Sequence, residues 1–188
     1  MLILLRHGRT RLNAQGRLQG RVDEPLDEVG EAQAKAAAAH LGPVDQVISS
    51  PLRRARETAA AFGQPVEIDD RWVELSYGIY EGVPHAEVPS EAWANWKQDP
   101  DWVPEGGESL ATLDARVRTA CEDIRSRAAD RDVVVVSHVS PIKAAVAWAL
   151  GVGPEMSWRS HLSHASICRI DTRRAEPILV RFNEVVPP

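Results

Sequence analysis

The chain has 188 residues, of which 44% are hydrophobic and 26% are charged, so its composition is that of a globular protein and not of a disordered one. Its net charge of −5 disfavours general binding to nucleic acid or to anionic membranes, and any basic pocket must therefore be local. The two cysteines, Cys121 and Cys168, are too few for a disulfide framework and lack metal-ligand spacing, so we expect buried thiols.

Targeting signals are not evident in the sequence. The apolar opening is too short for the core of a signal peptide, and its positive charge follows it instead of preceding it. No run of about 18 uninterrupted apolar residues is present to cross a membrane. We therefore expect a cytoplasmic protein with no membrane or nucleic-acid partner, built as a single domain over residues 1–188.

The first predicted strand is the apolar run at residues 2–5, which has no polar alternation and is typical of a strand buried on both faces of a parallel sheet. Arg6, His7 and Gly8 follow where this strand should end. In open α/β sheets, ligands bind beyond the carboxyl ends of the strands. A cation, an imidazole and a flexible glycine at that edge suit an anionic substrate and a nucleophile or base.

The next predicted elements are a polar loop over residues 11–26 and an alanine-rich helix over 31–41. A short strand over 44–50 then leads into a helix for which Ser50 is the expected N-cap. Arg53 and Arg54 fall in the first turn of that helix, again beyond the end of a strand. A third short strand is predicted over residues 65–68.

The segment over residues 77–107 is rich in proline, glycine and acidic residues, and we predict a lid or cap excursion containing a short helix at 90–97. Trp93, Trp96 and Trp102 lie close together in it. We expect these tryptophans to be packing anchors, with the further hypothesis that some of them line the mouth of the site. His85 lies in the same segment, and we assign it no function from the sequence.

The last part of the chain begins with a long helix that Ser109 is predicted to cap. Four valines at 133–136 form the strongest strand signal and end at Ser137 and His138. A helix over about 141–150 and two closing strands, 165–170 and 178–182, complete the chain. Strands alternating with helices in this way predict an α/β fold, a three-layer αβα sandwich with a mostly parallel central sheet.

Two histidines, His7 and His138, therefore each follow an apolar strand. If these strands are neighbours, both imidazoles emerge at one edge of the sheet, where Arg54 or Arg53 joins them. A neutral imidazole is a good nucleophile toward phosphorus, and guanidiniums match phosphate oxygens in bidentate geometry. This constellation predicts a phosphate site built without a metal.

The same segments resemble, in the same order, the motifs of the histidine phosphatase superfamily, which also contains the cofactor-dependent phosphoglycerate mutases. The resemblance reaches from residue 1 to about residue 143 and implies a phosphoglycerate mutase-like fold. We expect the reaction to need no cofactor. The matching segments are Arg6-His7-Gly8 with Thr10 and Asn13, Gln19-Gly20, the run 50–55, the run 74–82, the run 106–109 and Ser137-His138.

The resemblance implies a role for each matching residue. His7 becomes the phosphohistidine, and Glu74 protonates the leaving oxygen and later activates water. The residues implied to hold the phosphoryl oxygens are Arg6, Arg54 and His138, assisted by Asn13 and Gln19. The family pattern selects Arg54 over Arg53.

One departure from the family pattern is Val139, because many relatives have glycine after the second histidine. A backbone N–H of Val139 can still face phosphate, while the added side chain narrows the pocket. This run resembles relatives near the α-ribazole phosphatase-like branch, including phosphatase domains fused to ribonuclease H. We expect no ribonuclease H domain here, because the chain is too short to contain one.

These observations favour a metal-independent phosphomonoester hydrolase that acts on a small phosphorylated substrate. A phosphoglycerate mutase is the nearest alternative, but it needs extra basic residues around the pocket, and Lys97 is the one Lys or Arg of the segment 77–107. A non-catalytic phospho-ligand binding module is the second alternative, which His7, His138 and Glu74 together argue against. The sequence leaves the oligomeric state open.

A metal site at His161 and His164 is a further alternative, because their spacing is one that a metal could use. No further ligand cluster accompanies these two histidines in the sequence. We expect them to rim the substrate pocket or to cap a strand.

Overall fold

The structure, a computed structural model that describes residues 1–187, contains a six-stranded sheet with the strand order β3-β2-β4-β1-β5-β6. Strands β3, β2, β4 and β1 are parallel neighbours, and β5 pairs antiparallel with both β1 and β6. The strands are β1 (Leu2–Arg6), β2 (Gln46–Ser49), β3 (Val66–Ile68), β4 (Val133–Ser137), β5 (Ile167–Asp171) and β6 (Ile178–Glu184).

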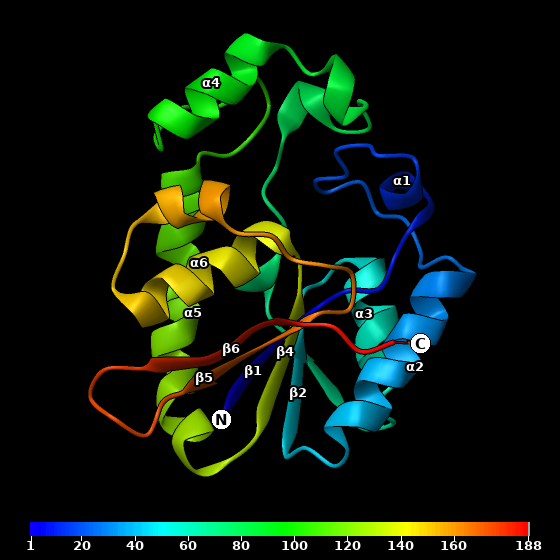
Figure 1. Cartoon of the computed structure of the whole chain (residues 1–188), viewed down its shortest axis with the longest axis vertical. Helices are drawn as coiled ribbons and strands as arrows, with labels where there is room; N and C mark the ends of the chain where they lie inside the picture. The colour runs from blue at the N-terminus through cyan, green and yellow to red at the C-terminus, as the bar shows by residue number, and fades with distance from the viewer. Residues whose placement is uncertain (188) are drawn as a thin grey trace.

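Helices cover both faces of this sheet, as Figure 1 shows: α5 and α6 lie on one side, and α2 and α3 on the other. The helices are α1 (Arg11–Ala14), α2 (Glu28–Leu41), α3 (Arg53–Ala60), α4 (Ser90–Gln98), α5 (Leu110–Asp130) and α6 (Val139–Leu150). The predicted three-layer α/β fold with a mostly parallel sheet is confirmed. Within residues 1–187, no helix has both the length and the apolar character that crossing a bilayer requires.

Strands β1 and β4 are apolar up to their last residue, as expected for strands with both faces buried. In β1, Leu2 and Leu4 join the core under α5 and α6, whereas Ile3 and Leu5 join the core under α2 and α3. The four valines of β4 divide in the same way, and all four are 0% exposed. Each such side chain stabilises the fold by about 1.5–3 kcal/mol relative to its exposed state.

The long connection between β3 and α5 passes through three short 3₁₀ turns and α4. In Figure 1, most of this segment lies beyond the sheet at the upper end of the molecule, where α1 also lies. Trp96 is 1% exposed and meets Tyr77 and Trp102 edge-on, with ring centroids 5.6 Å and 5.0 Å away. These contacts confirm that the aromatic residues of the segment are packing anchors.

Several predicted element boundaries are wrong at their N-terminal ends. Helix α2 begins at Glu28 and not at residue 31, because the Asp27 carboxylate caps it by accepting from the Gly30 N–H at 2.8 Å. Helix α6 begins directly after His138 instead of near residue 141. Ser50 does not cap α3: the N-cap is Leu52, which makes no side-chain capping bond.

Glycines allow α2 to dock closely on the loop that follows β1. A Cβ atom on Gly30 would lie 2.1 Å from the carbonyl oxygen of Arg9, and one on Gly8 would lie 2.3 Å from the carbonyl oxygen of Gly30. Both distances are far below van der Waals contact. The backbone of α2 therefore fixes the position of the loop that carries His7.

Replacing Gly30 with alanine should consequently destabilise the protein. At a free helix position this change is favourable by about 0.5–1 kcal/mol, but here the overlap should lower the free energy of unfolding by about 1–3 kcal/mol. Urea denaturation measures the change, and the exposed Lys35→Ala on the same helix should stay within about 0.5 kcal/mol of the native protein. A Gly30→Ala protein that is more stable than the native one would contradict the docking.

Candidate active site

The register of the parallel strands brings together residues that lie far apart in the sequence. Arg6 pairs with Ser137 across β1 and β4, and the N–H of His7 donates to the carbonyl oxygen of Ser137 at 2.9 Å. His7 and His138 therefore leave the sheet side by side, with ring centroids 5.0 Å apart. The prediction that their strands are neighbours is confirmed.

Arg54 lies between these two imidazoles. It occupies the first turn of α3 and is 1% exposed. Its Nε–H points at His7 Nε2 and at His138 Nδ1, each at 3.2 Å. Its Nη1 and Nη2 groups donate to the carbonyl oxygens of Val22 and Gly20 at 2.9 Å and 2.7 Å, which fixes the guanidinium in place.

Hydrogen bonds assign the tautomer of each imidazole. His7 Nδ1 lies 2.7 Å from the carbonyl oxygen of Gly8, and because that oxygen can only accept, Nδ1 carries the proton and Nε2 keeps its lone pair. His138 Nδ1 accepts from Arg54, so its Nε2–H donates to Ser50 Oγ at 2.7 Å. Both rings are therefore neutral in this arrangement.

The electrostatics of the site agree with neutral rings. Burial, then Arg54 and Arg6, hold the pKa of His7 well below its ordinary value of 6.5. Burial, then Arg54 and His7, lower the pKa of His138 in the same direction. His7 Nε2 is therefore an unprotonated nitrogen beside fixed positive charge, which is the state that a nucleophile requires.

Arg6 supplies a second guanidinium from the end of β1. Its Nη1 donates to the carbonyl oxygen of Leu162 at 2.7 Å, and burial lowers its pKa only to about 10, so it stays charged at neutral pH. Its buried Nε has no hydrogen-bond partner among residues 1–187. A buried donor without a partner is costly, and an oxygen of a bound anion would satisfy it.

Glu74 holds a carboxyl group against the N-terminus of α6. The group is 6% exposed, and its Oε1 accepts from the N–H groups of Leu75 at 2.8 Å and Ser140 at 3.2 Å. The hydroxyl of Tyr77 lies 3.3 Å from that of Ser140. Two backbone donors on one oxygen hold this carboxyl in a defined position.

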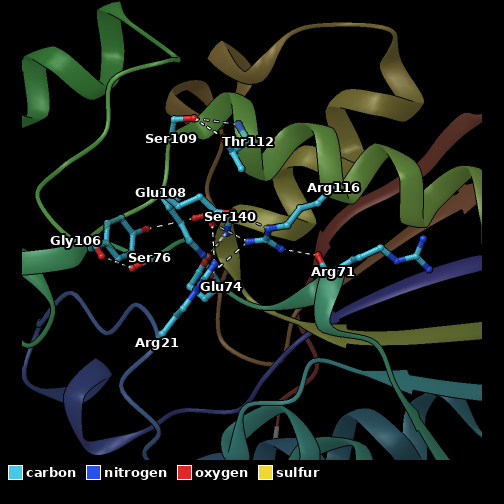
Figure 2. Close-up of polar contacts among 12 residues, drawn as sticks. Arg21, Arg71, Glu74, Ser76, Gly106, Glu108, Ser109, Thr112, Arg116 and Ser140 are labelled. Atoms are coloured by element: carbon cyan, nitrogen blue, oxygen red, sulfur yellow. Dashed lines mark hydrogen bonds and ion pairs between the residues drawn. The ribbon is translucent and has the colours of Figure 1, made fainter.

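A cluster of charged side chains fixes the backbone of Glu74, as Figure 2 shows. Its carbonyl oxygen accepts from Arg21 Nε at 3.1 Å and from Arg116 Nη2 at 3.4 Å. The carboxylate of Glu108 binds both arginines, with Nη2 of Arg21 at 3.0 Å and Nε of Arg116 at 2.9 Å. Glu108 thus ties α5 and the loop after α1 to the segment that carries Glu74.

A cavity of about 140 Å³ opens above these groups. Every predicted site residue lines it except His138, which is 0% exposed. The lining residues are Arg6, His7, Asn13, Arg17, Leu18, Gln19, Gly20, Arg54, Glu74, Tyr77, His85 and Val139. Among residues 1–187, no tryptophan lines this cavity, so the hypothesis that tryptophans line its mouth is wrong.

Two of the predicted residues at the cavity wall are held by Thr10. Gln19 Oε1 accepts from the hydroxyl of Thr10 at 2.8 Å, and Asn13 Oδ1 accepts from the Thr10 N–H at 3.2 Å. These bonds use the oxygen of each side-chain amide. The NH₂ group of each amide is the end that donates hydrogen bonds, the chemistry that an anion needs.

Sequence reasoning missed several residues that support the site. Ser50, assigned to helix capping, binds His138 instead; its place at the end of β2, which matches that of His7 after β1, was the available signal. Thr58 accepts from the Gly8 N–H at 3.1 Å and donates to the carbonyl oxygen of Arg54 at 2.8 Å. Helical spacing alone does not distinguish Thr58 from a core residue.

The pair His161 and His164 lies outside the cavity lining. His161 is exposed, and burial and Arg6 lower the pKa of the half-buried His164 to about 4. Over the described residues, no group of three or more His, Cys, Asp or Glu side chains is placed to hold a metal ion.

Comparison with known proteins places these observations in a family. Residues 2–185 match the histidine phosphatase superfamily (branch 1). The chain is 41% identical over 176 residues to the bifunctional protein Rv2228c of Mycobacterium tuberculosis, with 88% of this chain and 48% of that protein covered. It therefore spans about half the length of that relative. It is 39% identical over 173 residues to the glucosyl-3-phosphoglycerate phosphatase of Mycolicibacterium vanbaalenii, with coverages of 84% and 76%.

A similar solved structure is that of a phosphoserine phosphatase from Entamoeba histolytica in complex with 3-phosphoglyceric acid. It aligns with a TM-score of 0.90 at 28% identity, and the alignment covers 98% of this chain and 96% of that one. The family match, the fold and the ordered motifs agree. The chain belongs to the histidine phosphatase superfamily.

Proposed function

We propose that the chain is a metal-independent phosphomonoesterase that hydrolyses a small phosphorylated metabolite through a phosphohistidine on His7. The observation that carries this proposal is the neutral His7, whose unprotonated Nε2 belongs to a cavity that also holds Arg6 and Arg54. Family membership and phosphatase relatives support it. In this proposal residues 1–188 form one catalytic domain, with the segment 77–107 as its cap.

The proposed reaction has two steps. His7 Nε2 attacks phosphorus, the ester P–O bond breaks, and Glu74 donates a proton to the leaving oxygen. Water then attacks the phosphorus of the phosphohistidine and gives a proton to Glu74, the P–N bond to His7 Nε2 breaks, and inorganic phosphate leaves. Arg6 and Arg54 stabilise the charge on the phosphoryl oxygens in both steps, where each preorganised donor contributes about 3 kcal/mol.

The remaining residues complete the phosphate site in this proposal. The Nε–H of Arg54 is shared between two imidazoles at 3.2 Å each, so a phosphoryl oxygen beside His7 can replace His7 Nε2 as its acceptor while the guanidinium stays in place. His138 accepts from Arg54 and donates to Ser50, so in this proposal it acts on the phosphoryl group through Arg54, which it keeps in position. Asn13, Gln19 and the backbone N–H of Val139 donate from the cavity wall.

The first test is hydrolysis of p-nitrophenyl phosphate in the presence of a chelator. The native protein should be active, and His7→Ala should lower kcat by at least about 10³-fold, because the attacking atom is lost. His40→Ala, at a surface histidine paired with Glu184, is the matched control and should stay active. Activity that the chelator abolishes, or that His7→Ala retains, would refute the proposal.

The protonation state of the site is tested by NMR titration of labelled imidazoles. The lowered pKa values of His7 and His138 keep both rings neutral as the pH falls below 6.5, where histidines of an unfolded chain become protonated. The unfolded state then binds more protons, so the free energy of unfolding should decrease as the pH falls from 6.5 to 5.5. Protonation of either ring at pH 6.5 would contradict the assigned tautomers.

The role of Glu74 is tested by the dependence on the leaving group. Glu74→Gln should lower kcat/KM for an alkyl phosphate by about 10²–10⁴-fold, because an alkoxide needs a proton to leave. The loss should be much smaller for p-nitrophenyl phosphate, whose leaving group departs as a stable anion. Equal losses for both substrates would show that Glu74 is not the acid.

A further inference from the structure

Two basic side chains at the cavity, Arg17 and His85, have no part in the proposed chemistry. They come from segments far apart in the sequence, the loop after α1 and the 3₁₀ turn His85–Glu87. A short antiparallel arrangement joins these segments, with an isolated bridge between Arg17 and Pro84. Its bonds are His85 N–H to Gly16 O at 2.9 Å, Leu18 N–H to Val83 O at 2.9 Å and Gly82 N–H to Leu18 O at 2.6 Å. The two side chains are thereby brought to one cavity.

Both side chains are held in place without a ligand. One nitrogen of Arg17, Nη1, donates to the carbonyl oxygen of Gly82 at 2.6 Å, and a guanidinium has five N–H donors in all. His85 Nδ1 donates to the carbonyl oxygen of Gly16 at 2.6 Å, which directs Nε2 away from that carbonyl. The ring stacks on Trp93 with an interplanar angle of 4° and a centroid distance of 6.3 Å. Binding would therefore require little further ordering of either group.

The charges that line the cavity exceed what a phosphoryl group needs. Three guanidiniums line it, those of Arg6, Arg17 and Arg54, and within the described part of the chain Glu74 is the one acidic side chain there. The proposed phosphate site uses Arg6 and Arg54, and the reaction gives Arg17 no role. The guanidinium of Arg17 is therefore available to a second anionic group of the substrate.

We propose that Arg17 and His85 form a subsite for a carboxylate of the substrate, which makes the substrate a small phosphorylated carboxylic acid. A guanidinium binds a carboxylate through parallel N–H groups, and the His85 ring lies at the same cavity with its Nε2 directed away from Gly16. Arg17 and His85 line the same cavity as Arg6 and Arg54, so one small molecule can place its phosphoryl group and its carboxylate there together. This inference rests on the proposed phosphatase function and specifies its substrate class.

The test compares 3-phosphoglycerate with glycerol 3-phosphate, which differ only in a carboxylate against a hydroxymethyl group. The native protein should have a kcat/KM at least about tenfold higher for 3-phosphoglycerate, as expected for hydrogen bonds to a charged group. Arg17→Gln should reduce the ratio of the two kcat/KM values by about tenfold, mainly by raising KM for 3-phosphoglycerate. Arg17→Lys should restore part of the ratio, and His85→Gln should lower it less than Arg17→Gln does.

Arg11→Gln is the matched control, because Arg11 lies in the neighbouring helix α1, pairs with Glu24 and does not line the cavity. For Arg11→Gln, the ratio of kcat/KM for 3-phosphoglycerate to kcat/KM for glycerol 3-phosphate should equal that of the native protein. The subsite is refuted if Arg17→Gln and His85→Gln both leave the ratio unchanged. It is also refuted if the native protein hydrolyses p-nitrophenyl phosphate but does not prefer 3-phosphoglycerate. Neither outcome would refute the phosphatase function. Absence of hydrolysis for all three phosphates would instead overturn the phosphatase function and the subsite with it.

Discussion

The buried Nε–H of Arg54, shared between His7 and His138, is the contact on which the site depends. A guanidinium cannot accept a hydrogen bond, so each imidazole must present a lone pair to it. That requirement sets the tautomer of both rings and disfavours their protonation. The main-chain oxygens of Gly20 and Val22 bind the other end of Arg54 and make the arrangement rigid.

The fold supplies this arrangement through strand order and register. Because β4 lies between β1 and β2, residues that follow three strands meet at one edge: His7, His138 and Ser50. Glu74 is brought to the same cavity by a different device, the cluster in which Glu108 joins Arg21 and Arg116 (Figure 2). The reacting groups are thus held by backbone register on one side and by ion pairs on the other, which is how a site is preorganised before substrate arrives.

The features of the fold and the site that the sequence predicts are those with strong local signals. The apolar runs before His7 and His138 predict strands buried on both faces, since few other environments accept four consecutive aliphatic residues. Glu74 had no such signal and was found through resemblance to the family. Arg17 and His85 could not be found from local patterns, because the ladder that joins residues 16–18 to 82–85 depends on contacts more than 60 positions apart. Ser50 was misassigned because a serine before a helix has the same local signal whether it caps that helix or binds a distant ring.

The stereochemical course at phosphorus tests the central claim most directly. An ester whose phosphoryl oxygens are isotopically chiral would be hydrolysed by the native protein, and the configuration of the product phosphate determined. Two successive in-line displacements, first by His7 and then by water, invert the configuration twice and predict net retention. Net inversion would mean that water attacks the ester directly, and it would contradict a phosphohistidine on His7.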